Sequence, residues 1–185
     1  MNLIDFLRKN VENHGDKVAI IDNHKEITFF QLYGEVKKFS TNLEILNQEK
    51  IISLISENSI SFIIAYLGII NSGKIVHLIS PEISEMNLFN QLKSSESKNI
   101  ICNQLMKKKI SNFDSIKTTI FEIEEILLKH NNKKVKSNVN ELAYLIYTSG
   151  TTSEPKGVTV SHSMIEFTTK NIVKMLGYSS SDIDL

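Results

Sequence analysis

The fold class is decided by residues 51–79, which read IISLISENSISFIIAYLGIINSGKIVHLI. Two continuous apolar runs in this stretch, Ile51–Ser56 and Ile75–Ile79, are typical of strands that are buried on both faces. The segment between them, Ser59–Asn71, is apolar almost all round, which predicts a buried helix that ends at Ser72-Gly73. A buried strand, a helix and another buried strand in this order predict a parallel sheet with crossover helices.

The same alternation continues towards the C-terminus. The apolar pattern predicts a helix from about Ser84 to Lys93, strands over Asn99–Cys102 and Thr118–Phe121, and a short helix over Glu122–Lys129. Residues 130–140 are rich in Asn and Lys without periodicity, which predicts a surface linker. Strands that alternate with helices at this spacing predict an α/β fold with a doubly wound, largely parallel sheet.

Residues 1–46 follow a different pattern. Apolar spacing predicts an amphipathic helix over Asn2–Asn13, and Val18–Thr28 has the pattern of a β-hairpin. Thr28 can then cap a second helix. That helix carries an apolar stripe at steps of three and four residues, formed by Leu32, Val36, Phe39, Leu43 and Leu46. We therefore divide the chain into an N-terminal part, residues 1–46, and an α/β subdomain, residues 47–185.

Composition excludes several classes of protein. A hydrophobic content of 41% argues against general disorder, and the balance of 21 basic and 21 acidic residues removes the electrostatic case for a nucleic-acid partner. The longest apolar run, Phe62–Ile70, is far shorter than the ~20 residues that span a bilayer. The N-terminus lacks the apolar core of a signal peptide, and the single cysteine, Cys102, cannot form an internal disulfide. We expect a cytoplasmic protein without a membrane span.

The residues that carry chemistry lie in the stretch 147–158, YTSGTTSEPKGV. It separates a predicted strand over Glu141–Tyr147 from another over Val158–Ser161, so it lies at a strand's carboxyl end, where open α/β sheets bind ligands. Hydroxyl groups, backbone N–H groups near Gly150 and the ammonium of Lys156 can surround a polyphosphate. Composition alone leaves a Ser/Thr-rich hairpin connection as an equal alternative.

Two common nucleotide-binding motifs are absent from this stretch. The loop of nucleotide triphosphatases requires Gly-Lys-Ser/Thr leading into a helix, whereas Pro155-Lys156 here leads into a predicted strand. The Gly-x-Gly-x-x-Gly fingerprint of dinucleotide-binding folds is also missing.

Residues 147–158 resemble the phosphate-binding signature of the adenylate-forming (AMP-binding) superfamily. Its members include acyl- and aryl-CoA synthetases, adenylation domains of nonribosomal peptide synthetases, and luciferases. Three further stretches, Glu26–Leu32, Tyr66–Lys74 and Ser161-His162, are similar to other segments of the family. The resemblance covers essentially the whole chain in order and corresponds to the N-terminal portion of the family's large domain.

The resemblance implies an ATP-dependent ligase that acts in two steps. A carboxylic acid attacks the α-phosphorus of Mg-ATP to give an acyl-adenylate and pyrophosphate, and a thiol, coenzyme A or a carrier pantetheine, then displaces AMP. Catalysis of this kind depends on positioning and charge stabilisation. The residues implied to hold the phosphates are Thr148, Ser149, Gly150, Thr151, Thr152, Ser153, Lys156 and Gly157. No catalytic residue and no protein ligand to a metal is expected in this chain.

Two departures from the family pattern qualify these implications. Ser153 replaces a glycine that permits positive φ, and Glu154 adds a negative charge beside the site. The family's adenine, ribose and acyl motifs do not occur in the 185 residues, so we expect an N-terminal fragment of a ligase that is inactive alone. The alternative is a non-catalytic module that binds a nucleotide or a partner and keeps only the fold.

The remaining expectations concern packing. If part of the partner of the Leu32–Leu46 stripe is missing, we expect the chain to cover that stripe by self-association or by refolding residues 1–46 onto its own sheet. The alternative is a compact monomer in which the stripe already packs internally. Ser163 and Glu166 match a capping box, and His162 is expected at the entry of the same helix. A substrate-side role for His162, which its position in the family implies, is the alternative. Cys102 is expected to be a buried strand residue rather than a nucleophile.

Overall fold

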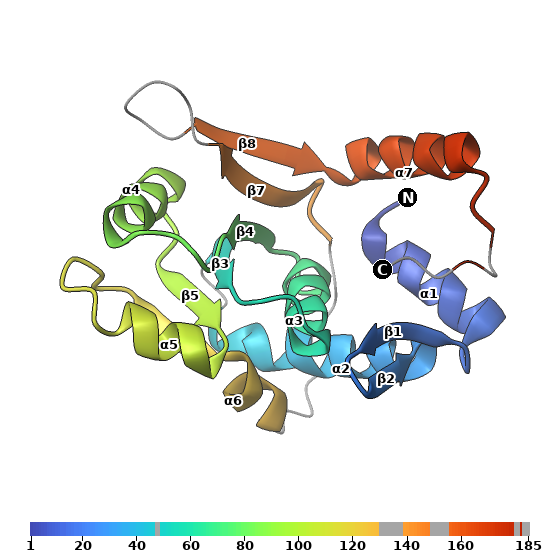
Figure 1. The fold of residues 1–185 in the computed structure, drawn as a ribbon, viewed down its shortest axis with the longest axis horizontal. Helices are drawn as coiled ribbons and strands as arrows, with labels where there is room; N and C mark the ends of the chain where they lie inside the picture. Colours follow the sequence, from blue (N-terminus) through green and yellow to red (C-terminus); the bar gives the residue numbers. More distant parts are fainter. Residues whose placement is uncertain (47–48, 130–138, 149–155, 180–181, 183–185) are drawn as a thin grey trace.

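The structure is a computed structural model that describes residues 1–46, 49–129, 139–148, 156–179 and 182. Its centre is a six-stranded sheet with the order β6-β5-β3-β4-β7-β8, and a separate two-stranded sheet pairs β1 with β2 (Figure 1). The separate sheet is the predicted hairpin, with antiparallel β1 (Val18–Asp22) and β2 (Lys25–Thr28).

The central sheet is parallel except at one edge. Its parallel strands are β3 (Ile51–Ile55), β4 (Ile75–Ile79), β5 (Asn99–Cys102), β6 (Thr119–Glu122) and β7 (Leu142–Thr148). The edge strand β8 (Lys156–Ser161) pairs antiparallel with β7. An antiparallel partner suits a short connection, because parallel strands need a crossover of a dozen residues or more.

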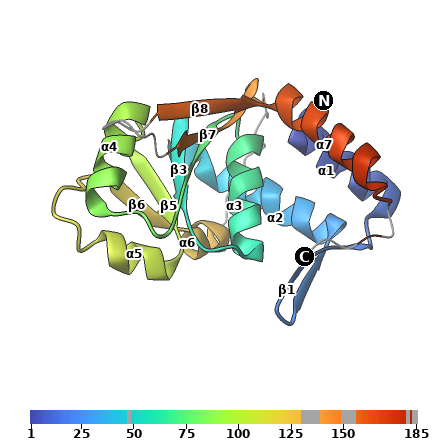
Figure 2. The same ribbon diagram turned by 45° about the horizontal axis from the view of Figure 1, so that its top comes forward.

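Helices cover both faces of this sheet, which confirms the predicted doubly wound α/β fold (Figure 2). One face carries α2 (Phe29–Asn42), the 3-10 helix η1 (Leu43–Leu46), α3 (Ile60–Asn71) and α6 (Ile123–Leu128). On this side, α1 (Leu3–His14) packs against α2 and α3. The other face carries α4 (Glu85–Ser95) and α5 (Gln104–Ile110). The last described helix, α7 (His162–Leu176), follows β8.

Most helices begin at a polar side chain that accepts a hydrogen bond from the backbone N–H three residues later, which satisfies a donor that the helix itself cannot pair. These capping residues are Asn2, Thr28, Ser59, Ser84, Asn103 and Ser161. Ser161, rather than the predicted Ser163, caps α7, and the hydroxyl of Ser163 bonds to that of Ser161 at 2.8 Å. The helix α5 was not predicted, since it is short and only Met106 and Ile110 of its three apolar side chains are buried.

The apolar stripe of α2 and η1 is buried inside the molecule. Leu32, Val36, Phe39, Leu43 and Leu46 all belong to one core cluster, which also contains residues of β3 and α3. The expectation that this stripe has lost part of its partner is therefore wrong, and the alternative of internal packing matches the structure, because α3 packs against the stripe. The predicted division at residue 46 stays a prediction, and the two parts share this core.

A close approach of α2 to α3 explains how the stripe is covered. Gly68 of α3 lies against Phe39 of α2, and a Cβ built at Gly68 would come within 2.6 Å of Phe39 Cδ1. Phe39 is 0% exposed. The missing side chain at Gly68 thus leaves the volume that the Phe39 ring fills.

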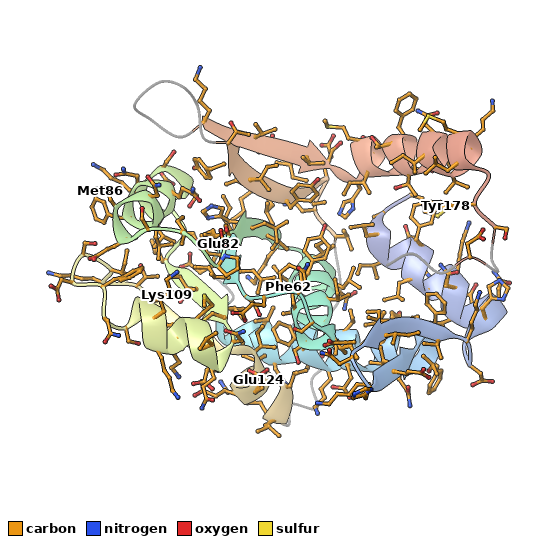
Figure 3. The ribbon with its side chains drawn as sticks, in the orientation of Figure 1. Phe62, Glu82, Met86, Lys109, Glu124 and Tyr178 are labelled. Atoms are coloured by element: carbon orange, nitrogen blue, oxygen red, sulfur yellow. The ribbon has the colours of Figure 1, made fainter. Side chains whose placement is uncertain are left out.

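Exposed apolar side chains gather instead on α7 and just after it, where Figure 3 labels Tyr178. They are Met164, Phe167, Ile172, Val173, Met175, Leu176 and Tyr178. Because the apolar stripe of α2 is buried, it offers no exposed apolar surface for self-association. In the described part of the chain, no helix has the length and apolar character needed to cross a membrane.

Candidate functional site

The candidate site lies where β7 and β8 meet at the carboxyl edge of the sheet. Their register pairs Tyr147 with Gly157 and Thr148 with Lys156, so the two ends of segment 149–155 are held side by side. Thr148, Lys156 and Gly157 are exposed there. A hydroxyl and an ammonium group on paired positions are donors that suit a phosphate group.

Five of the predicted phosphate-binding residues lie outside the described residues. They are Ser149, Gly150, Thr151, Thr152 and Ser153. The structure thus brings together only the two ends of the predicted loop, and the roles of all eight residues stay predictions.

A pocket of about 320 Å³ adjoins these ends, between the carboxyl ends of β4 and β7 and the start of α4. Its wall is mostly polar and is formed by Leu78, Ser80, Glu82, Ile83, Ser84, Asn87, Gln91 and Tyr147. Glu82 is labelled in Figure 3, next to α4. Ligands of open α/β sheets bind outside the carboxyl ends of the strands, so this pocket and the ends of the loop form one candidate site.

A buried histidine lies behind this site. His77 on β4 is 0% exposed, and its ring centroid is 5.1 Å from that of Tyr147. Its Nδ1 atom is 2.9 Å from the hydroxyl of Ser53 on β3, which donates to the hydroxyl of Ser97 at 2.9 Å. Sequence reasoning missed this group, although a histidine inside the apolar run Ile75–Ile79 is a signal that could have found it.

The hydrogen-bond donors of this group fix the protonation of His77. The Ser97 hydroxyl donates to the backbone carbonyl of Asn99, so it accepts the proton of Ser53. Ser53 has no further proton, and Nδ1 of His77 must therefore donate to it. Nε2 is then a bare acceptor, and it has no hydrogen-bond partner among the described residues. Burial lowers the pKa of His77 to about 4, while the nearby Gln91 side chain opposes this shift, so the imidazole is neutral at pH 7.

The other buried histidine ties the N-terminus to α7. His162 is the first residue of α7, as predicted, and its Nδ1 accepts a hydrogen bond of 3.3 Å from the backbone N–H of Leu3. The N-terminal ammonium of Met1 lies 2.7 Å from a carboxylate oxygen of Glu166. These contacts give His162 and Glu166 structural roles, and Glu166 does not act in the predicted capping box with Ser163.

A larger hollow of about 690 Å³ lies elsewhere on the molecule, at the amino ends of β5 and β6. Three lysines, Lys93, Lys98 and Lys117, stand around a partly apolar floor that includes Leu92 and Ile116. This hollow is the larger one, but it is at the opposite edge from Thr148 and Lys156. Strand polarity therefore favours the smaller pocket as the candidate site.

The cysteine and the acidic and histidine side chains of the described residues do not form a second candidate site. Cys102 is buried in β5, and burial raises the pKa of its thiol to about 12, so it is a core residue as expected. Within the described ranges, no group of three or more His, Cys, Asp and Glu side chains is placed to hold a metal ion. A Mg²⁺ ion that accompanies a nucleotide does not require such a group, because it is usually bound by one or two carboxylates together with phosphates and water.

A model of the AMP-binding enzyme family matches residues 7–183, nearly the whole chain. The chain belongs to the AMP-binding enzyme family. This result confirms the resemblance that the sequence suggested.

The chain is also similar to short stretches of two much longer proteins. The chain is 28% identical over 181 residues to indigoidine synthase of Streptomyces lavendulae, covering 94% of this chain and 14% of that protein. It is 30% identical over 176 residues to gramicidin S synthase 2 of Brevibacillus brevis, covering 92% of this chain and 4% of that protein. The chain thus spans a small part of the curated relatives that it matches.

Solved structures confirm the fold. The chain is similar to O-succinylbenzoate CoA synthetase (MenE) of Bacillus subtilis in complex with AMP, with a TM-score of 0.86 and 20% identity over 98% of this chain and 48% of that one. The same enzyme in complex with ATP and a magnesium ion matches with a TM-score of 0.85 and 19% identity, over 98% and 49% of the two chains. This member of the AMP-binding enzyme family therefore has the fold of about half of that synthetase.

Proposed function

We propose that the chain forms the phosphate-binding part of an ATP-dependent, AMP-forming ligase that joins a carboxylic acid to a thiol. The observation that carries the proposal is the location of residues 147–158, whose ends meet at the carboxyl edge of a doubly wound sheet in a member of the AMP-binding family. ATP with Mg²⁺ is the proposed cosubstrate. Coenzyme A or a carrier pantetheine is the proposed thiol acceptor.

In this proposal the protein contributes positioning and charge, not a nucleophile. Thr148, the residues from Ser149 to Ser153, and Gly157 would surround the β- and γ-phosphates of ATP. The ammonium of Lys156 would offset the charge that develops on the leaving pyrophosphate. The small-molecule acid and the adenine base would bind to other parts of the ligase, so the 185 residues alone are proposed to be inactive.

The first test is the binding of inorganic tripolyphosphate and of MgATP to the chain, measured by isothermal titration calorimetry. Lys156→Ala should weaken both by about tenfold or more, because a charge-assisted hydrogen bond contributes ~1.5–3 kcal/mol. Lys174→Ala removes an exposed lysine from α7, away from the loop, and should change neither affinity. Equal affinities for wild type and Lys156→Ala would contradict the assignment of the site.

The second test separates the ligase from a non-catalytic module. ATP–pyrophosphate exchange should be absent with the 185-residue chain and present with an enzyme that contains it, when the correct acid is supplied. Exchange by the chain alone, free of contaminating ligase, would show that it is not inactive alone. Tight ATP binding without ATP–pyrophosphate exchange in the longest protein that the natural gene encodes would favour a module that keeps only the fold.

A further inference from the structure

The ends of the predicted loop stand beyond the main sheet. The ladder between β4 and β7 ends at the pair Leu78 and Ile146, whereas the ladder between β7 and β8 continues to Thr148 and Lys156. Beyond Ile146, β7 therefore has only β8 as a strand neighbour among the described residues. A two-stranded ribbon of this kind is marginally stable by itself, so side-chain contacts must fix its direction.

One side chain in the ribbon makes such a contact. The Tyr147 ring lies diagonally across from His77 on β4, with the ring centroids 5.1 Å apart and the planes inclined by 58°. Tilted aromatic contacts at this distance are favourable beyond the apolar area that they bury. His77 cannot move freely, because it is 0% exposed and bonded to Ser53.

On the side away from β4, the Tyr147 ring lies against Gly157 of β8. This glycine is directly across from Tyr147 in the β7–β8 ladder, and a Cβ built on it would lie 3.1 Å from Tyr147 Cζ and 3.3 Å from Cε1. It would also lie 3.1 Å from Leu145 Cδ1. The ring thus occupies the space that a side chain at position 157 would need.

We infer that Tyr147 is a positioning residue that fixes Thr148 and Lys156 relative to the sheet, by packing between His77 and Gly157. The buried hydrogen-bonded group of Ser53, Ser97 and His77 is its anchor in the core. The inference rests on the proposed function, since Thr148 and Lys156 are the described groups that would face the phosphates. It adds Ser53, His77 and Ser97, which are buried and do not line the pocket, as residues that would act without touching the nucleotide.

The test compares amide hydrogen exchange in segments 144–148 and 156–160 by mass spectrometry. Tyr147→Ala should speed exchange in both segments at least tenfold, because the ribbon loses its contact with His77. Tyr147→Phe keeps the ring and should exchange like the wild type. Gly157→Ala displaces the ring from the other side and should speed exchange in the same two segments, which supplies a second variant if Tyr147→Ala folds poorly.

Tyr144→Ala is the matched control on the same strand. Tyr144 lies on the other face of β7, where its ring centroid is 6.4 Å from that of Tyr66. Its removal should lower the melting temperature without selectively speeding exchange at the ends of β7 and β8. If Tyr147→Ala and Tyr144→Ala give the same exchange pattern, the inference is overturned.

Tripolyphosphate binding is the second readout. Tyr147→Ala should weaken tripolyphosphate binding by about tenfold although Lys156 is intact. Tyr147→Phe, which keeps the ring, should bind with wild-type affinity. Unchanged affinity in Tyr147→Ala, with a wild type that binds, would overturn the positioning role. If the wild type binds no tripolyphosphate but the exchange pattern is as expected, the proposed function fails while the packing role of Tyr147 stands.

Discussion

The two faces of the central sheet carry different kinds of core. The face under α2 and α3 is packed with apolar side chains, among which Phe39 lies against Gly68. The face under α4 and α5 has its own apolar cluster, but it also buries the hydrogen-bonded group of Ser53, His77 and Ser97. Apolar packing supplies most of the free energy of folding, whereas a buried polar group fixes one geometry at the position where it occurs. Here that position is directly behind the ends of the predicted phosphate loop.

The largest expected effect comes from removing a buried aromatic side chain from the apolar face. Phe39→Ala should lower the free energy of unfolding by ~3–5 kcal/mol, because it removes a fully buried ring and leaves a cavity. Urea denaturation followed by circular dichroism would measure this loss. Phe30→Ala is the control on the same helix, since Phe30 is 67% exposed and its loss should cost under ~1 kcal/mol. Similar losses for the two variants would contradict the packing of α2 on α3.

The polar face should make stability depend on pH. The unfolded chain takes up a proton on His77 near its ordinary pKa of ~6.5, whereas the folded chain resists it until about pH 4. Stability should therefore fall as the pH drops from 6.5 to 4, by up to ~3 kcal/mol from this group. Burial and the N-terminal charge also lower the pKa of His162, which adds to the fall. Urea denaturation of wild type and His77→Gln at pH 7 and pH 4.5 isolates the share of His77, and an identical fall in both would refute it.

A smaller effect should come from adding one methyl group to the apolar face. Gly68→Ala should destabilise the protein by ~1–3 kcal/mol, because the new Cβ would overlap the Phe39 ring. Gly34→Ala is the matched change in α2, where nothing lies within 4 Å of the added Cβ. It should instead stabilise the helix by ~0.5–1 kcal/mol. Thermal unfolding should show a lower melting temperature for Gly68→Ala and a higher one for Gly34→Ala. A stabilising Gly68→Ala would show that α2 and α3 are not in close contact.

The smallest effect is expected on α7, where most of the apolar side chains are exposed. Phe167 is 69% exposed, so Phe167→Ala should change the free energy of unfolding of the 185-residue chain by no more than ~0.5 kcal/mol. Urea denaturation at two protein concentrations would measure this change. A loss above ~1.5 kcal/mol, or a loss that depends on concentration, would show that the apolar side chains of α7 are covered in solution.

Much of the fold could be predicted from the sequence because the signals are local. The continuous apolar runs of β3 and β4, and the capping residues Thr28 and Ser59, each act within a few residues of the chain. The α5 helix could not be predicted, because its seven residues bury only two apolar side chains. For the site, the sequence indicated the loop at 147–158 but not His77, since its neighbours in space come from other strands.

What the sequence by itself determined was the succession of strands and helices along the chain, except for α5, and the stretch that carries the family signature, because periodicity and motif depend only on residues close along the chain. Which apolar faces are covered was decided only by the tertiary structure. The helices α2 and α7 both carry apolar side chains at helical spacing, yet α3 buries those of α2 while those of α7 are exposed. Coverage of a face depends on contacts between residues far apart in the chain, and no local pattern contains that information.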